Sequence, residues 1–265
     1  MLRFGLSSLA IALGILGTVS MNATTTCAQG KKWATIKGQI VWEGDVPKQT
    51  PIKVSVNQDF CAKDPKPLEE DFVINPKNKG VKDVFVWITP TGAAKGAPFP
   101  AADIHPALAK PAKPGVEIDQ PCCRFIPHVL AAREGQTMTI LNSASIAHNA
   151  KWSSSKNGDI NPLLPAGAKF VLPKPLVAET GVISLNCSIH PWMKAHVRVF
   201  DHPYYAVTDD DGNFEIKMAP TGKYNLFVQH PTNGWLDGRD GRNGKPKVIE
   251  PGENDLKSIK MKLNP

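Results

Sequence analysis

The chain has 265 residues, of which 42% are hydrophobic and 21% are charged, and its formal net charge is +7. This length accommodates one or two domains with buried cores. The Lys and Arg residues are dispersed, and no RNP-like, zinc-finger or helix-turn-helix pattern accompanies them, which argues against nucleic-acid binding. A moderately basic surface instead favours acidic partners or anionic membranes and matrices.

The first 28 residues have the pattern of a secretory signal peptide. Arg3 precedes an apolar run from Phe4 to Val19, and small residues near Ala23 and Ala28 offer two cleavage points. A membrane anchor is the competing interpretation, but the run is shorter than the roughly 20 residues that span a bilayer. We expect residues 1–28 to be removed on export to the periplasm or the extracellular space. The mature chain should then carry no integral membrane segment.

Short alternating runs bounded by Gly, Pro, Asn and Asp recur along the mature chain, whereas helical periodicity is almost absent. This pattern predicts an all-β protein. A stretch rich in Pro, Ala, Lys and Gly at 91–115 predicts a linker or an extended surface loop. Strands are expected at 34–42, 81–88, 137–141, 182–185, 197–200, 213–218, 224–229 and 256–263.

Two segments, NSASIAHNAKW and NCSIHPWMKAH, contain the residues with the most distinctive chemistry. Cys187, His190 and Met193 follow one another at steps of three in the second segment, and His148 lies in the first. A type 1 (blue) copper site needs two imidazoles, one thiolate and a weak axial sulfur. The four side chains therefore predict one type 1 copper ion. Ligand type alone also allows zinc or a red copper centre. If no metal binds, Cys187 and Met193 would be core residues and His148 and His190 ordinary loop histidines.

The motif CSIHPWM, with an upstream HN, resembles the cupredoxins, and its C-x-x-H-x-x-M spacing resembles the amicyanin subgroup, with plastocyanin as a further relative. The resemblance covers about 116–200 and implies a Greek-key β-barrel. It also implies that the edge of the His190 imidazole is exposed. Asn149 and Ser188 match positions that hydrogen-bond to each other and tie the two ligand loops together.

The same resemblance implies an electron carrier rather than an enzyme. Its redox partner would be a protein such as a c-type cytochrome, which would dock on the apolar surface at Pro191 and Trp192. Two alternatives remain: a non-redox binding or adhesion module, and a copper-dependent small-molecule enzyme. An enzyme with type 1 copper usually needs a second centre with clustered histidines, and the spare histidines here are scattered in sequence. We expect a structural role for His128 and a solvent-facing position for His196.

Four cysteines remain if Cys27 leaves with the signal peptide. Cys187 must stay unpaired to bind metal, whereas an exported protein tends to oxidise its spare thiols. We expect one disulfide between Cys61 and Cys123, with Cys61 to Cys122 as the close alternative.

The C-terminal region, residues 201–265, contains AVTDDDGNFEIKMAPTGKYNLFVQH. This segment resembles the carboxypeptidase regulatory-like, or transthyretin-like, β-sandwich. The N-terminal β segment at 33–90 resembles the opening strands of the same sandwich. We therefore expect a cupredoxin domain at 116–200 to be inserted into a second small β-sandwich formed by the two flanking segments.

Overall fold

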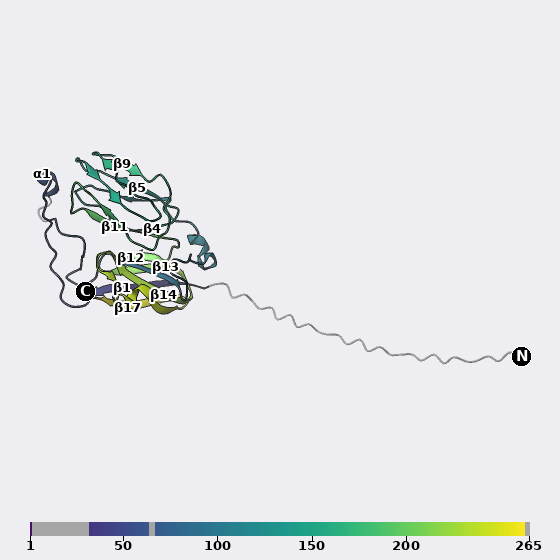
Figure 1. Cartoon of the computed structure of the whole chain (residues 1–265). Coiled ribbons are helices and arrows are strands. Elements are labelled where there is room, and N and C mark those ends of the chain that lie inside the picture. The colour runs from purple at the N-terminus through teal and green to yellow at the C-terminus, as the bar shows by residue number, and fades with distance from the viewer. Residues whose placement is uncertain (2–31, 64–66, 263–265) are drawn as a thin grey trace. The chain divides into compact units, whose positions relative to one another are not determined.

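The computed structural model describes Met1, residues 32–63 and residues 67–262. Apart from Met1, the signal peptide expected at residues 1–28 lies outside these residues. The described chain consists mainly of strands, with one four-residue helix, α1 (Gln58–Cys61), and short 3-10 turns, which confirms the predicted all-β fold class (Figure 1). Within the described residues, no helix combines the length and apolar character needed to cross a bilayer.

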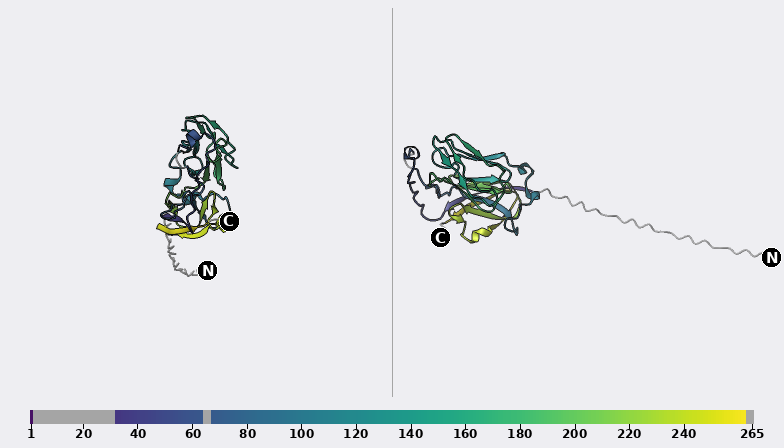
Figure 2. Two further views of the ribbon diagram at one scale, coloured as in Figure 1. Left: turned by 90° about the vertical axis from the view of Figure 1, so that its left-hand side faces the viewer. Right: turned by 45° about the horizontal axis from the view of Figure 1, so that its top comes forward.

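The first described strand lies at the centre of a sheet with two C-terminal strands. β1 (Trp33–Trp42) pairs antiparallel with β13 (Asn213–Pro220) and parallel with β17 (Gly252–Met261). Figure 2 shows the purple β1 beside the yellow end of the chain. Alternate β1 side chains such as Ile36 and Ile40 are buried, as the alternating sequence predicts.

A second sheet faces the same core. β2 (Phe85–Pro90) pairs with β12 (Tyr205–Val207) and with β14 (Gly222–His230). On its other side, β14 pairs with β15 (Gly234–Trp235) and β16 (Lys245–Ile249). One cluster of buried side chains includes residues from both sheets. Segments from either end of the described chain therefore build one core together.

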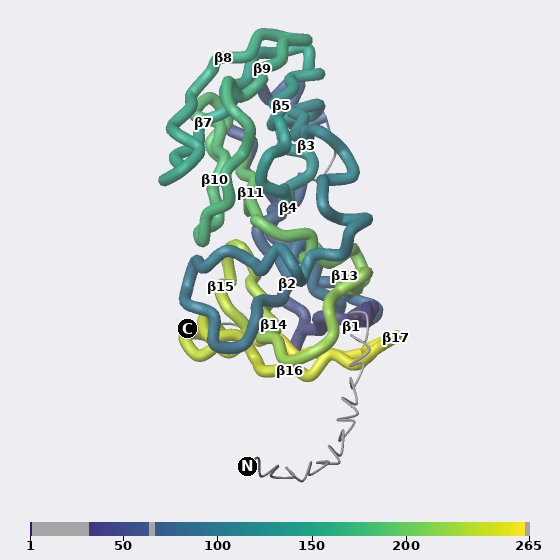
Figure 3. Tube along the Cα trace, turned by 90° about the vertical axis from the view of Figure 1, so that its right-hand side faces the viewer, coloured from purple at the N-terminus to yellow at the C-terminus, as the bar shows by residue number. Residues whose placement is uncertain are grey.

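The middle of the chain forms three further sheets. The first contains β4 (Val129–Arg133), β11 (Lys194–Phe200), β10 (Ile183–Asn186) and β7 (Lys151–Trp152) (Figure 3). The second contains β3 (Gly115–Ile118), β5 (Thr137–Leu141) and β9 (Lys169–Val171). The third pairs β6 (His148–Asn149) with β8 (Leu163–Leu164). A separate cluster of buried side chains lies among them.

β11 is buried on both of its faces. Ala195, Val197 and Val199 belong to the core of the middle sheets, whereas Phe200 packs in another cluster with Phe85 of β2. Arg198 lies on this second face, with its guanidinium carbon 4.1 Å from the centre of the Trp87 ring. Burial lowers the pKa of Arg198 to about 10. Because successive side chains of a strand point to opposite faces, the polar side chains of β11 lie in a buried region outside the core of the middle sheets.

The Pro-rich stretch at 91–115 is an extended connection with two 3-10 turns, Ala101–Asp103 and Pro106–Leu108. Phe99 is buried in the core of the outer sheets. Arg133 donates hydrogen bonds to the carbonyl oxygens of Leu108 and Ala109. The buried Phe99 side chain and the hydrogen bonds from Arg133 therefore hold this stretch against the neighbouring strands. The domain boundaries expected from the sequence stay predictions.

Candidate metal centre

The turn between β10 and β11 brings three of the predicted ligands to one end of the middle sheets. The backbone N–H of Cys187 donates to the carbonyl oxygen of Met193 at 3.2 Å, and the N–H of Met193 donates to that of His190 at 2.9 Å. These bonds fold residues 187–193 back on themselves. The three side chains are all buried.

His148 reaches the same place from β6, which belongs to a different sheet. Its Nδ1 lies 2.9 Å from Nδ1 of His190, and Sγ of Cys187 lies 3.7 Å from the same His190 nitrogen. The exposed fraction is 0% for both histidines and 3% for Cys187. Two imidazoles and one thiol thus meet in a space from which water is excluded.

These separations suit a single metal ion. A metal–nitrogen bond is about 2.0 Å and a metal–sulfur bond about 2.3 Å, so two donors on one ion lie at most about 4.3 Å apart. The donor set is also chemically suitable, because imidazole and thiolate together bind copper or zinc. Met193 is also buried and lies in the same turn as Cys187 and His190. Its backbone forms hydrogen bonds with the backbone of both residues.

The protonation of the two imidazoles also favours metal binding. Nε2 of His190 lies 2.9 Å from Oδ1 of Asn57. An amide oxygen can only accept, so Nε2 carries the proton and the lone pair of Nδ1 points into the cluster. Burial, together with the nearby His190, lowers the pKa of His148 to about 4, and burial lowers the pKa of His190. Both rings are therefore neutral near pH 7, as metal ligands must be.

Asn149 connects the two ligand segments. Its Oδ1 accepts the backbone N–H of Ser188 at 2.7 Å and lies 3.3 Å from Sγ of Cys187, which can donate to it. Its Nδ2 lies 3.4 Å from Oγ of Ser188 and donates more closely, at 2.6 Å, to Oδ1 of Asn161. The main link between the segments is therefore from the Asn149 side chain to the Ser188 backbone, and the hydroxyl contributes a longer contact.

The expectation that the edge of His190 is exposed is wrong. Asn57, at the start of α1, bonds to the Nε2 that would otherwise face solvent. The helix ends at Cys61, which forms a disulfide with Cys123, and the sulfur atoms of both lie within 4.8 Å of a ring nitrogen of His190. A segment far upstream in the sequence thus covers the imidazole. The disulfide is the favoured pairing of the sequence analysis, and Cys122 is an exposed thiol.

The two residues expected to dock a partner differ in exposure. Pro191 is exposed, whereas Trp192 is partly buried and its Nε1 donates to the carbonyl oxygen of Cys123 at 3.1 Å. The Trp192 ring centre lies 5.3 Å from that of His190. Trp192 therefore contributes to the covering of the centre as well as to its surface.

The structure also brings together three residues that lie in separate parts of the sequence. Donor atoms of Asp71, His128 and His196 lie within 4.8 Å of one another. The expectation that His196 faces solvent is wrong, since it is 7% exposed. Its strand has a second buried face, and His128 lies beside it because β4 and β11 run parallel. No spacing in the sequence signals this cluster, because the neighbours arise from the strand order.

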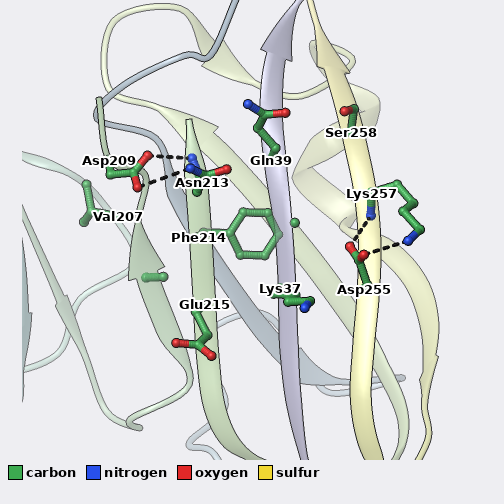
Figure 4. Close-up of a pocket in the computed structure, with 12 residues that line it drawn as sticks. Lys37, Gln39, Val207, Asp209, Asn213, Phe214, Glu215, Asp255, Lys257 and Ser258 are labelled. Carbon is green, nitrogen blue, oxygen red and sulfur yellow. Dashed lines mark hydrogen bonds and ion pairs between the residues drawn. The ribbon is translucent and has the colours of Figure 1, made fainter. Parts of the chain in front are cut away.

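An open groove lies over the outer sheet of β13, β1 and β17 (Figure 4). The ring of Phe214 packs against Gly38, its partner on the neighbouring strand, where an added Cβ would lie 3.0 Å from the ring. Asp255 and Lys257 form an ion pair at 2.7 Å along the groove. Its lining contains none of the candidate metal ligands.

No family model and no curated protein matches the chain. Among solved structures, a purple cupredoxin from Nitrosopumilus maritimus is 28% identical over 31% of this chain and 97% of its own, with a TM-score of 0.26. A copper-containing nitrite reductase from Thermus scotoductus is 24% identical over 32% of this chain and 22% of its own, with a TM-score of 0.29. A Cu(I) mutant form of amicyanin is 19% identical over 42% and 97%, respectively, with a TM-score of 0.28. All three cover less than half of this chain, so the metal centre is assigned from its own side chains.

Proposed function

We propose that the chain is an exported protein that holds one type 1 copper ion through His148, Cys187, His190 and Met193 and acts as a single-electron carrier. The observation that carries this proposal is the buried cluster in which Nδ1 of His190 lies 2.9 Å from Nδ1 of His148 and 3.7 Å from Sγ of Cys187. A disulfide between Cys61 and Cys123 supports export, because such bonds persist in oxidising compartments.

The residues around the cluster would hold the ligands in one geometry during electron transfer. Copper, when bound, supplies a one-electron couple between Cu(I) and Cu(II). Asn149 fixes the segment that begins at Cys187, and Asn57 fixes the tautomer and orientation of His190. Rigid ligands of mixed softness tolerate both oxidation states with little rearrangement, and the burial of the cluster excludes water as an additional ligand.

A redox protein such as a small c-type cytochrome would dock at Pro191 and Trp192. Pro191 is exposed, and the Trp192 ring centre lies 5.3 Å from that of His190 with the rings tilted by 59°, so this surface lies next to an imidazole of the centre. Pro191→Asp should slow electron exchange with such a partner and leave the copper spectrum unchanged. Equal exchange rates in the variant and the wild type would remove this surface from the proposal.

The deciding experiment is the absorption spectrum of the purified protein after addition of Cu(II). A short bond from the Cys187 thiolate to copper should give an intense visible charge-transfer band, with about one copper per chain. Cys187→Ser should abolish the band even where some metal still binds, whereas Cys122→Ser, which changes the exposed thiol, should keep it. A copper protein without such a band is not a type 1 centre. If no copper binds at all, a non-redox β-sandwich binding module becomes the better interpretation.

A copper-dependent enzyme is the second candidate. The cluster of Asp71, His128 and His196 favours it, because such an enzyme needs another group of potential ligands besides the type 1 set. Steady-state turnover of a small molecule that depends on both clusters would favour this candidate over a pure electron carrier.

A further inference from the structure

The cluster of Asp71, His128 and His196 forms on the far side of β11 from the middle core. His196 is on β11, and His128 immediately precedes β4. The N–H of His196 donates to the carbonyl oxygen of His128 at 2.8 Å, so the parallel strands place the two side chains next to each other. Asp71 comes from the segment before β2 and completes a group whose donor atoms lie within 4.8 Å of one another.

The imidazole of His196 has an unusual environment. The residue is 7% exposed, and within the described part of the chain neither of its ring nitrogens has a hydrogen-bond partner. Buried polar side-chain atoms are nearly always paired, so an orphaned ring calls for a specific explanation. The only aromatic neighbour found for it among the described residues is the ring of His128, 5.4 Å away and edge-on. The ring thus has donor and acceptor capacity that its protein surroundings leave unused.

His128 is oriented as a metal ligand would be. Its Nδ1 lies 3.0 Å from the carbonyl oxygen of Lys194, which can only accept, so Nδ1 carries the proton. The lone pair is then on Nε2. Metal-binding histidines commonly donate their second N–H to a carbonyl oxygen in this way. Burial lowers the pKa of both His196 and His128.

Asp71 supplies the negative charge of the group. Its Oδ2 accepts from Nζ of Lys194 at 2.9 Å, and its side chain is 34% exposed, which gives the cluster a route to solvent. His230 is a further buried histidine nearby: burial, and to a lesser extent His196 and His128, lower its pKa to about 3. Its Nδ1, however, accepts the backbone N–H groups of Thr232 and Asn233 and thereby stabilises a turn.

We propose that Asp71, His128 and His196 form a second metal site, separate from the Cys187 cluster, that binds a divalent transition-metal ion of the Zn(II) or Fe(II) type. Two imidazoles and one carboxylate without sulfur suit such borderline ions better than Cu(I). Three protein ligands leave a coordination position open for water or a small ligand, as in catalytic rather than structural sites. The backbone from Met193 to His196 connects the two clusters directly.

The test is a titration with Co(II), whose visible spectrum reports its coordination, followed by competition with Zn(II). It uses the full mature chain carrying His148→Gln and Cys187→Ser, which disables the first cluster, so its outcome does not depend on copper binding there. We expect one equivalent of metal. Outer-sphere partners alone are worth about 10- to 100-fold in metal affinity, so His196→Gln and Asp71→Asn should each weaken binding by at least about 100-fold.

The control is His105→Gln, which replaces the histidine that caps the 3-10 turn at Pro106–Leu108 and should leave Co(II) affinity unchanged. Asp71→Asn guards against misfolding, because Asp71 is partly exposed and an amide oxygen can still accept from Lys194. Failure of the parent protein to bind Co(II) or Zn(II) would overturn the proposal. So would equal affinities of the parent, His196→Gln and Asp71→Asn proteins.

Discussion

The imidazole of His190 is bonded through Nε2 to the Oδ1 of Asn57 at 2.9 Å, although 133 positions separate the two residues in the sequence. The exposed Asn57 therefore contacts one edge of a buried ring whose other nitrogen faces Cys187. The contact fixes the tautomer of His190, and it also covers the ring edge through which electrons would leave a type 1 copper centre. Asn57 thus both organises and shields the proposed site.

Removing this cover should accelerate electron exchange. Asn57 has φ 50°, a left-handed conformation that Gly adopts easily, so Asn57→Gly removes the amide with little backbone cost. Loss of the hydrogen bond should lower the free energy of unfolding by about 1 kcal/mol. Electron self-exchange of the copper protein, measured by NMR line broadening, should become faster. Asn57→Asp, which keeps an acceptor, is the matched control, and an unchanged rate in Asn57→Gly would show that the cover does not limit electron transfer.

The Cys61–Cys123 disulfide should contribute strongly to stability. It joins positions separated by 62 residues. Closing a loop of that length restricts the unfolded chain by about 4 kcal/mol in the entropic account. Replacing both cysteines by Ala should lower the free energy of unfolding by about that amount in urea. It should also speed the release of copper to a chelator, because Cys61 ends the helix that covers His190. Cys122→Ser should change neither quantity, and a double variant as stable as the wild type would contradict the expectation.

Asn149 should affect copper affinity although it is not one of the four proposed ligands. Its Oδ1 accepts the N–H of Ser188 at 2.7 Å and approaches Sγ of Cys187. Asn149→Ala leaves the backbone N–H of Ser188 without this acceptor, at a cost of about 1–3 kcal/mol in stability. Copper affinity should fall by about 10- to 100-fold, as for other outer-sphere partners. Asn149→Asp retains an acceptor and should lose less. Competition with a chelator measures both, and equal affinities of the Ala variant and the wild type would exclude the role.

Met193 should tune the reduction potential rather than the colour. The thioether is a weak axial donor in a type 1 centre, so Met193→Leu, which preserves buried volume at a site with 1% exposure, should keep the charge-transfer band. It should raise the potential, because a poorer donor stabilises Cu(II) less. Redox titration followed at the band gives the potential. A potential equal to or below that of the wild type would remove Met193 from the ligand set.

The sequence was sufficient to predict the longer strands with clear alternation and the grouping of the ligand loop, because both depend on local pattern, whereas short strands such as β6 and β8 were not predicted. The strand expected at 137–141 is β5 with the same bounds, and the spacing of Cys187, His190 and Met193 needs only one turn. The covering of His190 by Asn57 and the meeting of His128 with Asp71 depend on distant segments coming together. Local periodicity contains no information on such contacts, so the histidines looked scattered.

Buried histidines should make the metal-free protein sensitive to acid. Burial, and to a lesser extent the charges of Arg133 and Arg198, lower the pKa of His202 to about 3. An unfolded histidine titrates near pH 6.5. Between about pH 6.5 and 3 the unfolded state therefore binds a proton that the native state does not. As the pH falls through this range, the free energy of unfolding decreases by up to about 1.4 kcal/mol per pH unit for each such group.

His202→Asn keeps an acceptor for the N–H of Tyr204, which in the wild type bonds to Nδ1 of His202 at 3.0 Å. Urea unfolding at pH 6.5 and pH 4.5 should show a smaller loss of stability in His202→Asn than in the wild type, whereas His105→Asn, at a partly exposed position, should behave like the wild type. The same pH slope in His202→Asn and the wild type would mean that His202 is not a source of the acid sensitivity.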